Sequence, residues 1–171
     1  LTVTATDVDG NTSEFSESIH QGSFVVTTTA DSGEGSLRWA IEQANLNTEA
    51  DSILFNIPLD DAGFDGTVWT IRPRTNLPQL NTGTTIIDVF SQTRNQGDTN
   101  PDGPEIVIDG SNNTESYSIG FRLYSANNVI AGLVISGFNV TGIEIYFEEG
   151  HDNWIYGNYI GTDASGSDTL G

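Results

Sequence analysis

The sequence predicts an all-β fold, a solenoid of the parallel β-helix type, because a short unit recurs within it. Asn128 and its neighbours correspond to Asn153 and its neighbours 25 residues later. In the same region, residues 120–123 correspond to residues 142–145 at a spacing of 22 residues. Such a period, with Gly and Asn between brief runs of Ile, Val and aromatic residues, is typical of stacked coils of short strands. No helical segment or Leu-x-x-Leu-x-Leu frame lies inside the repeat, which argues against a leucine-rich horseshoe.

The asparagines of the repeat are expected to have structural roles. Asn tolerates the left-handed backbone conformation of turns, and its amide can bond a neighbouring backbone group or the Asn one coil away. The residues concerned are Asn127, Asn128, Asn153 and Asn158.

Composition and charge exclude several functions. The 5 basic residues are all arginines and stand against 24 acidic ones, which leaves a formal charge of −19. Such a surface repels phosphate backbones and anionic lipids, so we expect no nucleic-acid partner. There is no Cys for disulfides, and no apolar run approaches the ~20 residues of a membrane helix, so no membrane insertion is expected. An acidic β protein without Lys or Cys indicates an extracellular or cell-surface location.

Residues 1–22 are predicted to form a strand and linker ahead of the main domain. Leu1, Val3 and Ala5 alternate with threonines, which is the pattern of a strand with one apolar face. The segment from Thr4 to Ser13 resembles the last strand of bacterial immunoglobulin-like repeats. A single strand needs a partner. This one is therefore expected either to dock on its own domain, or to act as a plain linker, or to be donated to a neighbouring copy by β-augmentation.

An amphipathic helix is predicted next, over about residues 36–47. Leu37, Ala40, Ile41 and Ala44 fall at i, i+3, i+4 and i+7 and form a single apolar stripe. A serine directly before the stripe is the expected N-cap. The first coil of a solenoid otherwise presents unpaired strand edges and an open core, so we expect the helix to be its lid.

Strands are predicted on both sides of this helix, separated by Pro, Gly and Asp turns. Their apolar runs are too short for helices and are rich in Ile, Val and aromatic residues. They cover residues 24–29, 52–57, 67–71, 84–88 and 105–109.

Several stretches of this chain carry a resemblance to a known family. They are Asp31–Asn45, Leu77–Pro78, Pro104–Gly110, Gly132–Phe138 and Gly157–Asp163. Over residues 24–171, nearly all of the predicted β-helix domain (23–171), the chain resembles the right-handed parallel β-helix repeat proteins of bacterial and archaeal surfaces. The resemblance implies a large secreted or surface-anchored protein of structural or adhesive function, without an established catalytic motif. Further coils normally follow in that family, so we expect the last coil here to be uncovered and to meet a lid, a partner or another copy.

A candidate calcium site lies between two of the predicted strands. Asp98, Asn100, Asp102 and Asp109 match ligand positions 1, 3, 5 and 12 of a calcium-binding loop, with a Gly at position 6. Asp109 stands where the pattern has a bidentate Glu, and a strand is predicted where a helix should begin. The alternative is an acidic surface loop, and no cofactor is strictly required. Asp7, Asp9 and Asn11 form a weaker second candidate.

The acidic turn Glu148–Asp152 contains one imidazole, that of His151. Paired carboxylates can act as acid and base or nucleophile in glycoside hydrolysis. Adjacent acids on an exposed turn are more often solvated charge, and the fold does not justify an active site here. We therefore predict no catalytic residues.

Aromatic residues are concentrated in the strands around this turn, where Tyr146, Phe147, Trp154, Tyr156 and Tyr159 lie. Rings on an outer face stack on sugar rings, whereas rings on an inner face stack coil on coil. Trp154, Tyr156 and Tyr159 are the candidate glycan contacts, with core or interface packing as the alternative use. Asn11, Asn112 and Asn139 each begin an N-glycosylation pattern.

These features together predict a non-catalytic extracellular structural module. We expect a subunit of a surface filament or adhesive surface protein that joins copies of itself head to tail, through stacked coils and the strand at Leu1, Val3 and Ala5. The alternative is a carbohydrate-binding or polysaccharide-cleaving β-helix module. A groove shared by the aromatic strands and the turn Glu148–Asp152 would favour this alternative.

Overall fold

The computed structural model describes residues 22–146 and 148–170, which are mostly short strands and turns. The strands of this part of the chain are β1 (Ser23–Val26), β2 (Asp51–Phe55), β3 (Trp69–Ile71), β4 (Thr85–Asp88), β5 (Ile106–Asp109), β6 (Ile119–Leu123), β7 (Val129–Ala131), β8 (Leu133–Ser136), β9 (Thr141–Ile145), β10 (Trp154–Tyr156) and β11 (Tyr159–Ile160). The helices are α1 (Leu37–Ala44), α2 (Phe90–Gln96) and the short 3-10 helix η1 (Gly110–Asn112). The expectation of an all-β fold is confirmed.

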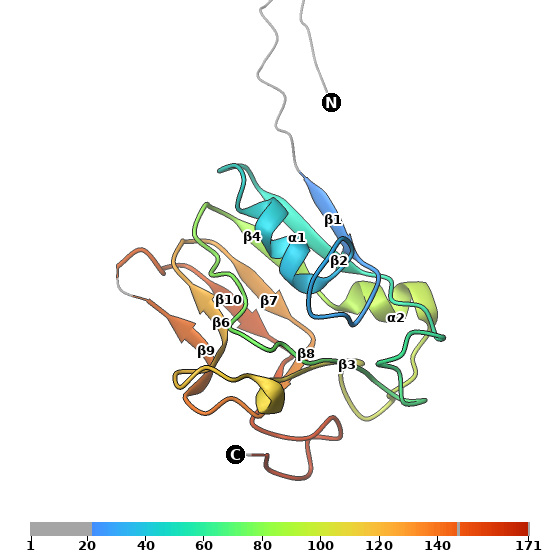
Figure 1. Cartoon of the computed structure of the whole chain (residues 1–171). Helices are drawn as coiled ribbons and strands as arrows, with labels where there is room; N and C mark the ends of the chain where they lie inside the picture. The colour runs from blue at the N-terminus through green and yellow to red at the C-terminus, as the bar shows by residue number, and fades with distance from the viewer. Residues whose placement is uncertain (1–21, 147, 171) are drawn as a thin grey trace, which may run out of the picture.

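The strands form three parallel sheets (Figure 1). The first has the order β1-β2-β4-β7-β10, the second β11-β8-β5-β3, and the third pairs β6 with β9. From β6 onward the chain runs through the three sheets as β6, β7 and β8, and then again as β9, β10 and β11. Each round, here termed a coil, therefore lays every strand beside the matching strand of the round before.

The strand registers confirm both spacings predicted from the repeat. Strand β10 pairs with β7 so that Ile155 lies beside Ile130, at the spacing of 25 residues that also separates Asn128 from Asn153. Strand β9 pairs with β6 at the spacing of 22 residues that separates Arg122 from Glu144. Two unequal spacings coexist because the turns between strands differ in length.

The core lies between the sheets and consists of side chains at alternate strand positions. In β2, β3, β4 and β5 buried residues alternate with half-buried ones, as the pleat requires. Ile53, Ile87 and Ile130 occupy one register position in successive strands of the first sheet, and each is fully buried. Fully burying one such side chain contributes about 1.5–3 kcal/mol, so this column supplies much of the cohesion between coils.

A polar column runs beside the apolar one, at the register position where β2 and β4 begin and which lies directly before β7 and β10. Asn128 Oδ1 accepts from the Thr85 N–H at 3.0 Å, and Asn153 Oδ1 accepts from the Asn128 N–H at 2.8 Å. Asp51 occupies the same register position in β2, two strands before Asn128 in the sheet, and accepts from the Gly22 N–H at 2.9 Å. The structural role predicted for these asparagines is confirmed.

Left-handed backbone occurs at only one of the predicted asparagines. Asn127 has φ 61°, and Asp152 has φ 53° at the matching position one coil later. Asn158 instead contributes through its amide, because its Oδ1 accepts from the Leu133 N–H at 2.9 Å and its Nδ2 donates to the Ile130 carbonyl at 2.8 Å.

Helix α1 packs against β1 and β2 at the first coil, where the lid was predicted (Figure 1). All four residues of its predicted apolar stripe are buried, and the Ser36 hydroxyl accepts from the Trp39 N–H at 3.2 Å. The helix ends earlier than residue 47, since the Asn45 side chain donates to the Gln79 carbonyl at 2.8 Å.

Helix α2 was not expected from the sequence. It has no apolar stripe, and polar side chains hold it instead. Gln92 brackets Ile57, with its Oε1 accepting from the Ile57 N–H at 2.9 Å and its Nε2 donating to the Ile57 carbonyl at 2.8 Å. The Ser91 hydroxyl accepts from the Phe55 N–H at 2.7 Å. These side chains bond backbone groups at and beyond the end of β2 that would otherwise pair with a neighbouring strand.

The predicted strands agree with the observed ones to within a few residues. The range 24–29 becomes Ser23–Val26, and 67–71 becomes Trp69–Ile71. Residues 1–21 lie outside the described part of the chain. Among the residues that are described, no helix has the length and apolar character needed to cross a bilayer.

Candidate functional site

The coil formed by β9, β10 and β11 exposes apolar side chains at positions that are buried in the coil before it. On the core-facing positions of β6, β7 and β8, Leu123, Ile130 and Ile135 are each 0% exposed. Their register partners in β9, β10 and β11 are Ile145 at 49%, Ile155 at 36% and Ile160 at 48% exposure. These three isoleucines are here termed the terminal face. They continue the apolar core and are exposed at one end of the stack of described strands.

The strand edges at this end lack neighbours within the described residues. β10 and β11 are the last strands of their sheets, and β9 has only β6 beside it. The edge therefore presents backbone donors and acceptors next to open apolar surface. The opposite edge strand of the first sheet is β1, so the two strand edges of this sheet that have no partner among the described residues lie at opposite ends of the stack (Figure 1).

A groove lies beside helix α2, where the chain turns from the first sheet into the second. It has a volume of about 420 Å³ and is open to solvent. It is lined by Gly132 and Gly157, by Phe90 and Thr93 of α2, by residues 98 and 100–105, and by Tyr159. This feature is here termed the α2 groove.

Glycine is required at two of the positions that line the groove. Gly132 and Gly157 have φ 81° and 63°. A Cβ at either position would lie 3.3 or 3.2 Å from the Phe90 ring, respectively. The absence of side chains there lets Phe90 reach across two later coils, and its ring stacks on that of Tyr156 with centroids 6.4 Å apart.

Glu105 is the most deeply buried carboxyl of the groove, at 5% exposure. The Thr93 hydroxyl lies 2.9 and 2.8 Å from its two oxygens. Burial raises the pKa of Glu105, and the negative charge of Asp98 raises it further, against the opposing effect of the Thr93 hydrogen bond. Sequence reasoning missed this residue because it treated it only as the start of a strand.

The predicted calcium ligands are divided between two places. Asp98, Asn100 and Asp102 line the α2 groove. Asp109 ends β5, where its carboxylate pairs with Arg72 at 2.9 Å and accepts from the Ser111 N–H. In the described ranges, no group of three or more acidic or His side chains is placed to hold a metal ion. Calcium binding stays a prediction, and the weaker candidates Asp7, Asp9 and Asn11 fall among residues 1–21, outside the described residues.

The acidic turn does not line the α2 groove in the described part of the chain. Tyr159 lines the α2 groove, whereas none of the residues 148–152 does. His151 pairs with Asp152 at 2.9 Å, and both side chains are more than half exposed. This geometry is that of a solvated turn, as the simpler interpretation expected.

The other sites predicted from sequence lie on different parts of the surface. Trp154 and Tyr156 are 70% and 52% exposed on β10, next to the terminal face, while the Tyr159 hydroxyl donates to the Asp102 carbonyl at 2.9 Å. Asn112 and Asn139 are exposed, although the Asn139 amide already bonds residues 115, 116 and 118. Asn11 and the predicted assembly residues Leu1, Val3 and Ala5 lie outside the described residues.

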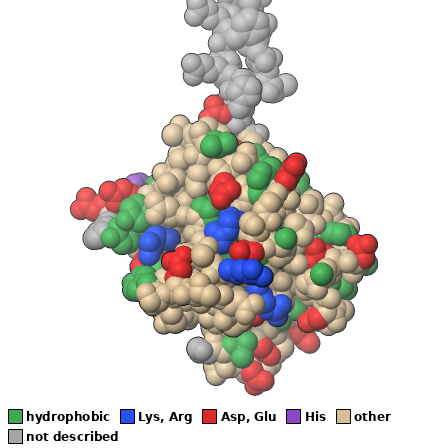
Figure 2. Space-filling model, viewed as in Figure 1, with side chains coloured by type: hydrophobic (Ala, Val, Ile, Leu, Met, Phe, Trp, Pro, Cys, Tyr) green, Lys and Arg blue, Asp and Glu red, His purple; other side chains and the backbone are tan. Residues whose placement is uncertain are grey.

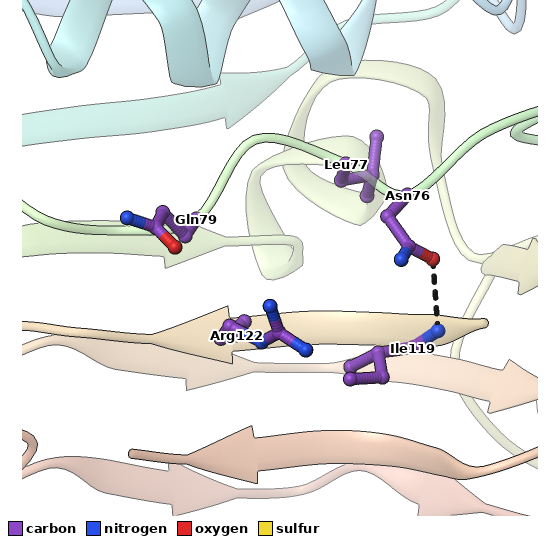
Figure 3. Close-up of a pocket in the computed structure, with 5 residues that line it drawn as sticks. All are labelled: Asn76, Leu77, Gln79, Ile119 and Arg122. Atoms are coloured by element: carbon purple, nitrogen blue, oxygen red, sulfur yellow. Dashed lines mark hydrogen bonds between the residues drawn. The ribbon is translucent and has the colours of Figure 1, made fainter. Parts of the chain in front are cut away.

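A smaller cavity lies between residues 76–80 and β6 (Figure 3). Its volume is about 60 Å³, and Asn76 Oδ1 accepts from the Ile119 N–H at 2.9 Å across it. A space of this size holds a few water molecules rather than a ligand. Its polar lining, which includes Gln79 and Arg122, fits hydrated packing between chain segments.

Arginines on the face shown in Figure 2 lie beside acidic side chains. Ion pairs join Arg38 to Asp31 at 3.1 Å and Arg72 to Asp109 at 2.9 Å. Arg94 pairs with Asp88 at 2.6 Å on another part of the fold. The scarce positive charge is thus largely neutralised, and the surface as a whole stays acidic.

Comparison with known proteins adds no assignment, since no protein-family model and no curated protein matches this chain.

Proposed function

We propose that this chain is a structural module of the cell exterior, a right-handed parallel β-helix whose coils stack end to end with those of a second copy. Three parallel sheets with constant registers support the β-helix. The right hand is the one that nearly all parallel crossovers adopt, and it agrees with the family resemblance. The module is non-catalytic in this proposal, and its role is to transmit load along stacked ladders.

The terminal face is the observation that carries the proposal. Ile145, Ile155 and Ile160 occupy positions that are fully buried in the coil before. Open apolar surface bordered by unpaired strand edges favours pairing with another β structure. Covering these side chains by one further layer would restore the alternation seen in the rest of the stack.

A second copy fits this end because the free edges of the first sheet lie at its opposite ends. β10 of one copy would meet the edge of β1 in the next, beside helix α1, which packs against β1 and β2 at that end. Residues 1–22 of that copy would supply a strand through Leu1, Val3 and Ala5. Such a contact joins two different surfaces. It therefore propagates into a filament instead of closing into a dimer.

Assembly is tested by sedimentation velocity and negative-stain electron microscopy of the purified chain over a range of concentrations. We expect the wild-type chain to form linear oligomers, and the double variant Ile155→Asp/Ile160→Asp to sediment as a monomer. The matched control is Leu59→Asp, because Leu59 is 52% exposed and does not belong to the terminal face. A wild-type chain that stays monomeric at every concentration would overturn the proposal.

A further inference from the structure

We propose that the α2 groove is a binding site for a neutral glycan, a hydroxyl-rich ligand without anionic groups. This function goes beyond end-to-end assembly. No isoleucine of the terminal face lines the groove. A variant can therefore lose end-to-end assembly and keep glycan binding, or the reverse.

The groove has the size of a small-molecule site and presents an exposed aromatic ring. Its volume of about 420 Å³ falls within the ~300–1,000 Å³ typical of small-molecule sites. Gly132 and Gly157 have no side chains, and the Phe90 ring lies against them. Phe90 is 41% exposed and lines the groove together with Tyr159, and exposed aromatic rings pack against the apolar C–H face of a sugar.

The polar groups of the groove match hydroxyl donors. Asp98 and Asp102 are exposed carboxylate acceptors that line the groove, and neither forms an ion pair with another described residue. Carboxylates accept through several lone pairs and fit neighbouring hydroxyls of one ring. Among the described residues, no basic side chain lines the groove. Uronic acids, sulfates and phosphates would therefore meet like charge here, on a chain whose net charge is already −19.

The walls are held in place before any ligand arrives. The buried Asn100 amide donates to the Pro104 carbonyl at 2.9 Å and to the Ala164 carbonyl at 3.0 Å. The Tyr159 hydroxyl donates to the Asp102 carbonyl. Residues 98–105 are thus hydrogen-bonded at two points to residues of the C-terminal part of the chain, Tyr159 and Ala164. A preformed site loses less conformational freedom on binding, so more of the contact energy appears as affinity.

The test is saturation-transfer NMR with maltohexaose, cellohexaose and chitohexaose as neutral probes, hexagalacturonate as the anionic probe, and spermine as a cation without sugar rings. We expect transfer to at least one neutral hexasaccharide and none to hexagalacturonate. Titration calorimetry of the ligand that binds should show Phe90→Ala raising Kd about tenfold. Asp98→Asn, at an exposed side chain, is the second variant and should also weaken binding.

Two exposed aromatics outside the groove serve as controls. Tyr117→Ala and Trp154→Ala remove side chains that are 52% and 70% exposed and line no part of the groove, so binding should be unchanged. The proposal is overturned if no neutral hexasaccharide shows transfer, if binding survives both Phe90→Ala and Asp98→Asn, or if spermine alone binds. Loss of binding in Trp154→Ala alone would move the glycan site to β10 and likewise overturn it.

Discussion

Asp51 and Asn128 occupy the same place in different coils, yet only one of them carries a charge. Both accept a backbone N–H from the preceding coil. Asn128 also donates from Nδ2 to the Ser125 carbonyl at 2.8 Å and to Asn153 Oδ1 at 3.0 Å. Asp51 is 1% exposed, and its Oδ2 has no hydrogen-bond partner in the described part of the chain. A buried carboxylate oxygen in this state is destabilising.

Exchanging the two side chain types should therefore change stability in opposite directions. Asp51→Asn keeps the acceptor and removes the charge, so we expect the free energy of unfolding to rise by about 1 kcal/mol. Asn128→Asp removes both donors and buries a carboxylate, so we expect a loss of about 3 kcal/mol. Urea unfolding at neutral pH measures both. A loss of stability in Asp51→Asn would contradict this account.

The same carboxyl predicts a pH dependence of stability. Burial raises the pKa of Asp51 above its ordinary 3.8, so between 3.8 and the folded value the folded state binds more protons than the unfolded state. Stability then falls as the pH rises through this window. The gain from Asp51→Asn should be largest at neutral pH and vanish towards about pH 4. A gain that does not depend on pH would show that the charge is not its cause.

The pKa of Asp61 is shifted in the opposite direction from that of Asp51, so its effect on stability has the opposite pH dependence. Burial opposes its ionisation, but hydrogen bonds from Thr29, Gly63 and Thr28 outweigh burial and lower its pKa. Its contribution is present above pH 3.8 and is lost as the pH falls through the folded pKa. Asp61→Asn should therefore destabilise the chain at neutral pH, with the neighbouring Asp60→Asn as a control without effect in the same urea experiment.

At the scale of single elements, α2 depends on side-chain amides in place of apolar contacts. Gln92 satisfies both backbone groups of Ile57 in a buried setting. Residues that join elements in this way stabilise the fold without producing hydrophobic periodicity. This is the physical reason why the helix could not be predicted from its sequence.

Removing that amide should detach the helix. Gln92→Leu leaves a buried N–H and a buried carbonyl without partners, which costs about 2–4 kcal/mol. Gln96→Leu on the same helix removes an exposed hydrogen bond to Asn56 and should cost less than about 1 kcal/mol. Thermal unfolding followed by circular dichroism compares the two variants. Equal losses would show that Gln92 has no special role.

At the scale of the whole molecule, charge opposes the stacking that the terminal face favours. Each copy carries a net charge of −19, so like charge must be screened before copies can approach. Raising the salt concentration from about 20 mM to about 300 mM shortens the Debye length several-fold. The average oligomer measured by sedimentation should therefore grow with salt. Assembly that weakens with salt would instead indicate ionic contacts between copies.

The repeat spacings, the parallel strand pairing and the apolar stripe of α1 could all be predicted from the sequence. These features depend on local periodicity, because each repeat has the same alternation of inward and outward residues. Element boundaries differ by a few residues, as at α1, where the side chain of Asn45 bonds the Gln79 carbonyl directly after the helix end.

Which side chains share a site depends on the tertiary structure. The predicted calcium ligands separate because β5 carries Asp109 away from Asp98, whereas Phe90 and Tyr159 line one groove although 68 residues of the sequence lie between them. Contacts of this kind arise from the stacking of coils and from an inserted helix, and neither leaves a periodic trace along the chain. An uncovered last coil was expected from the sequence, but the strand registers were needed to identify its exposed residues. Ile130 and Ile155 look alike in sequence and differ in whether another strand lies beside them.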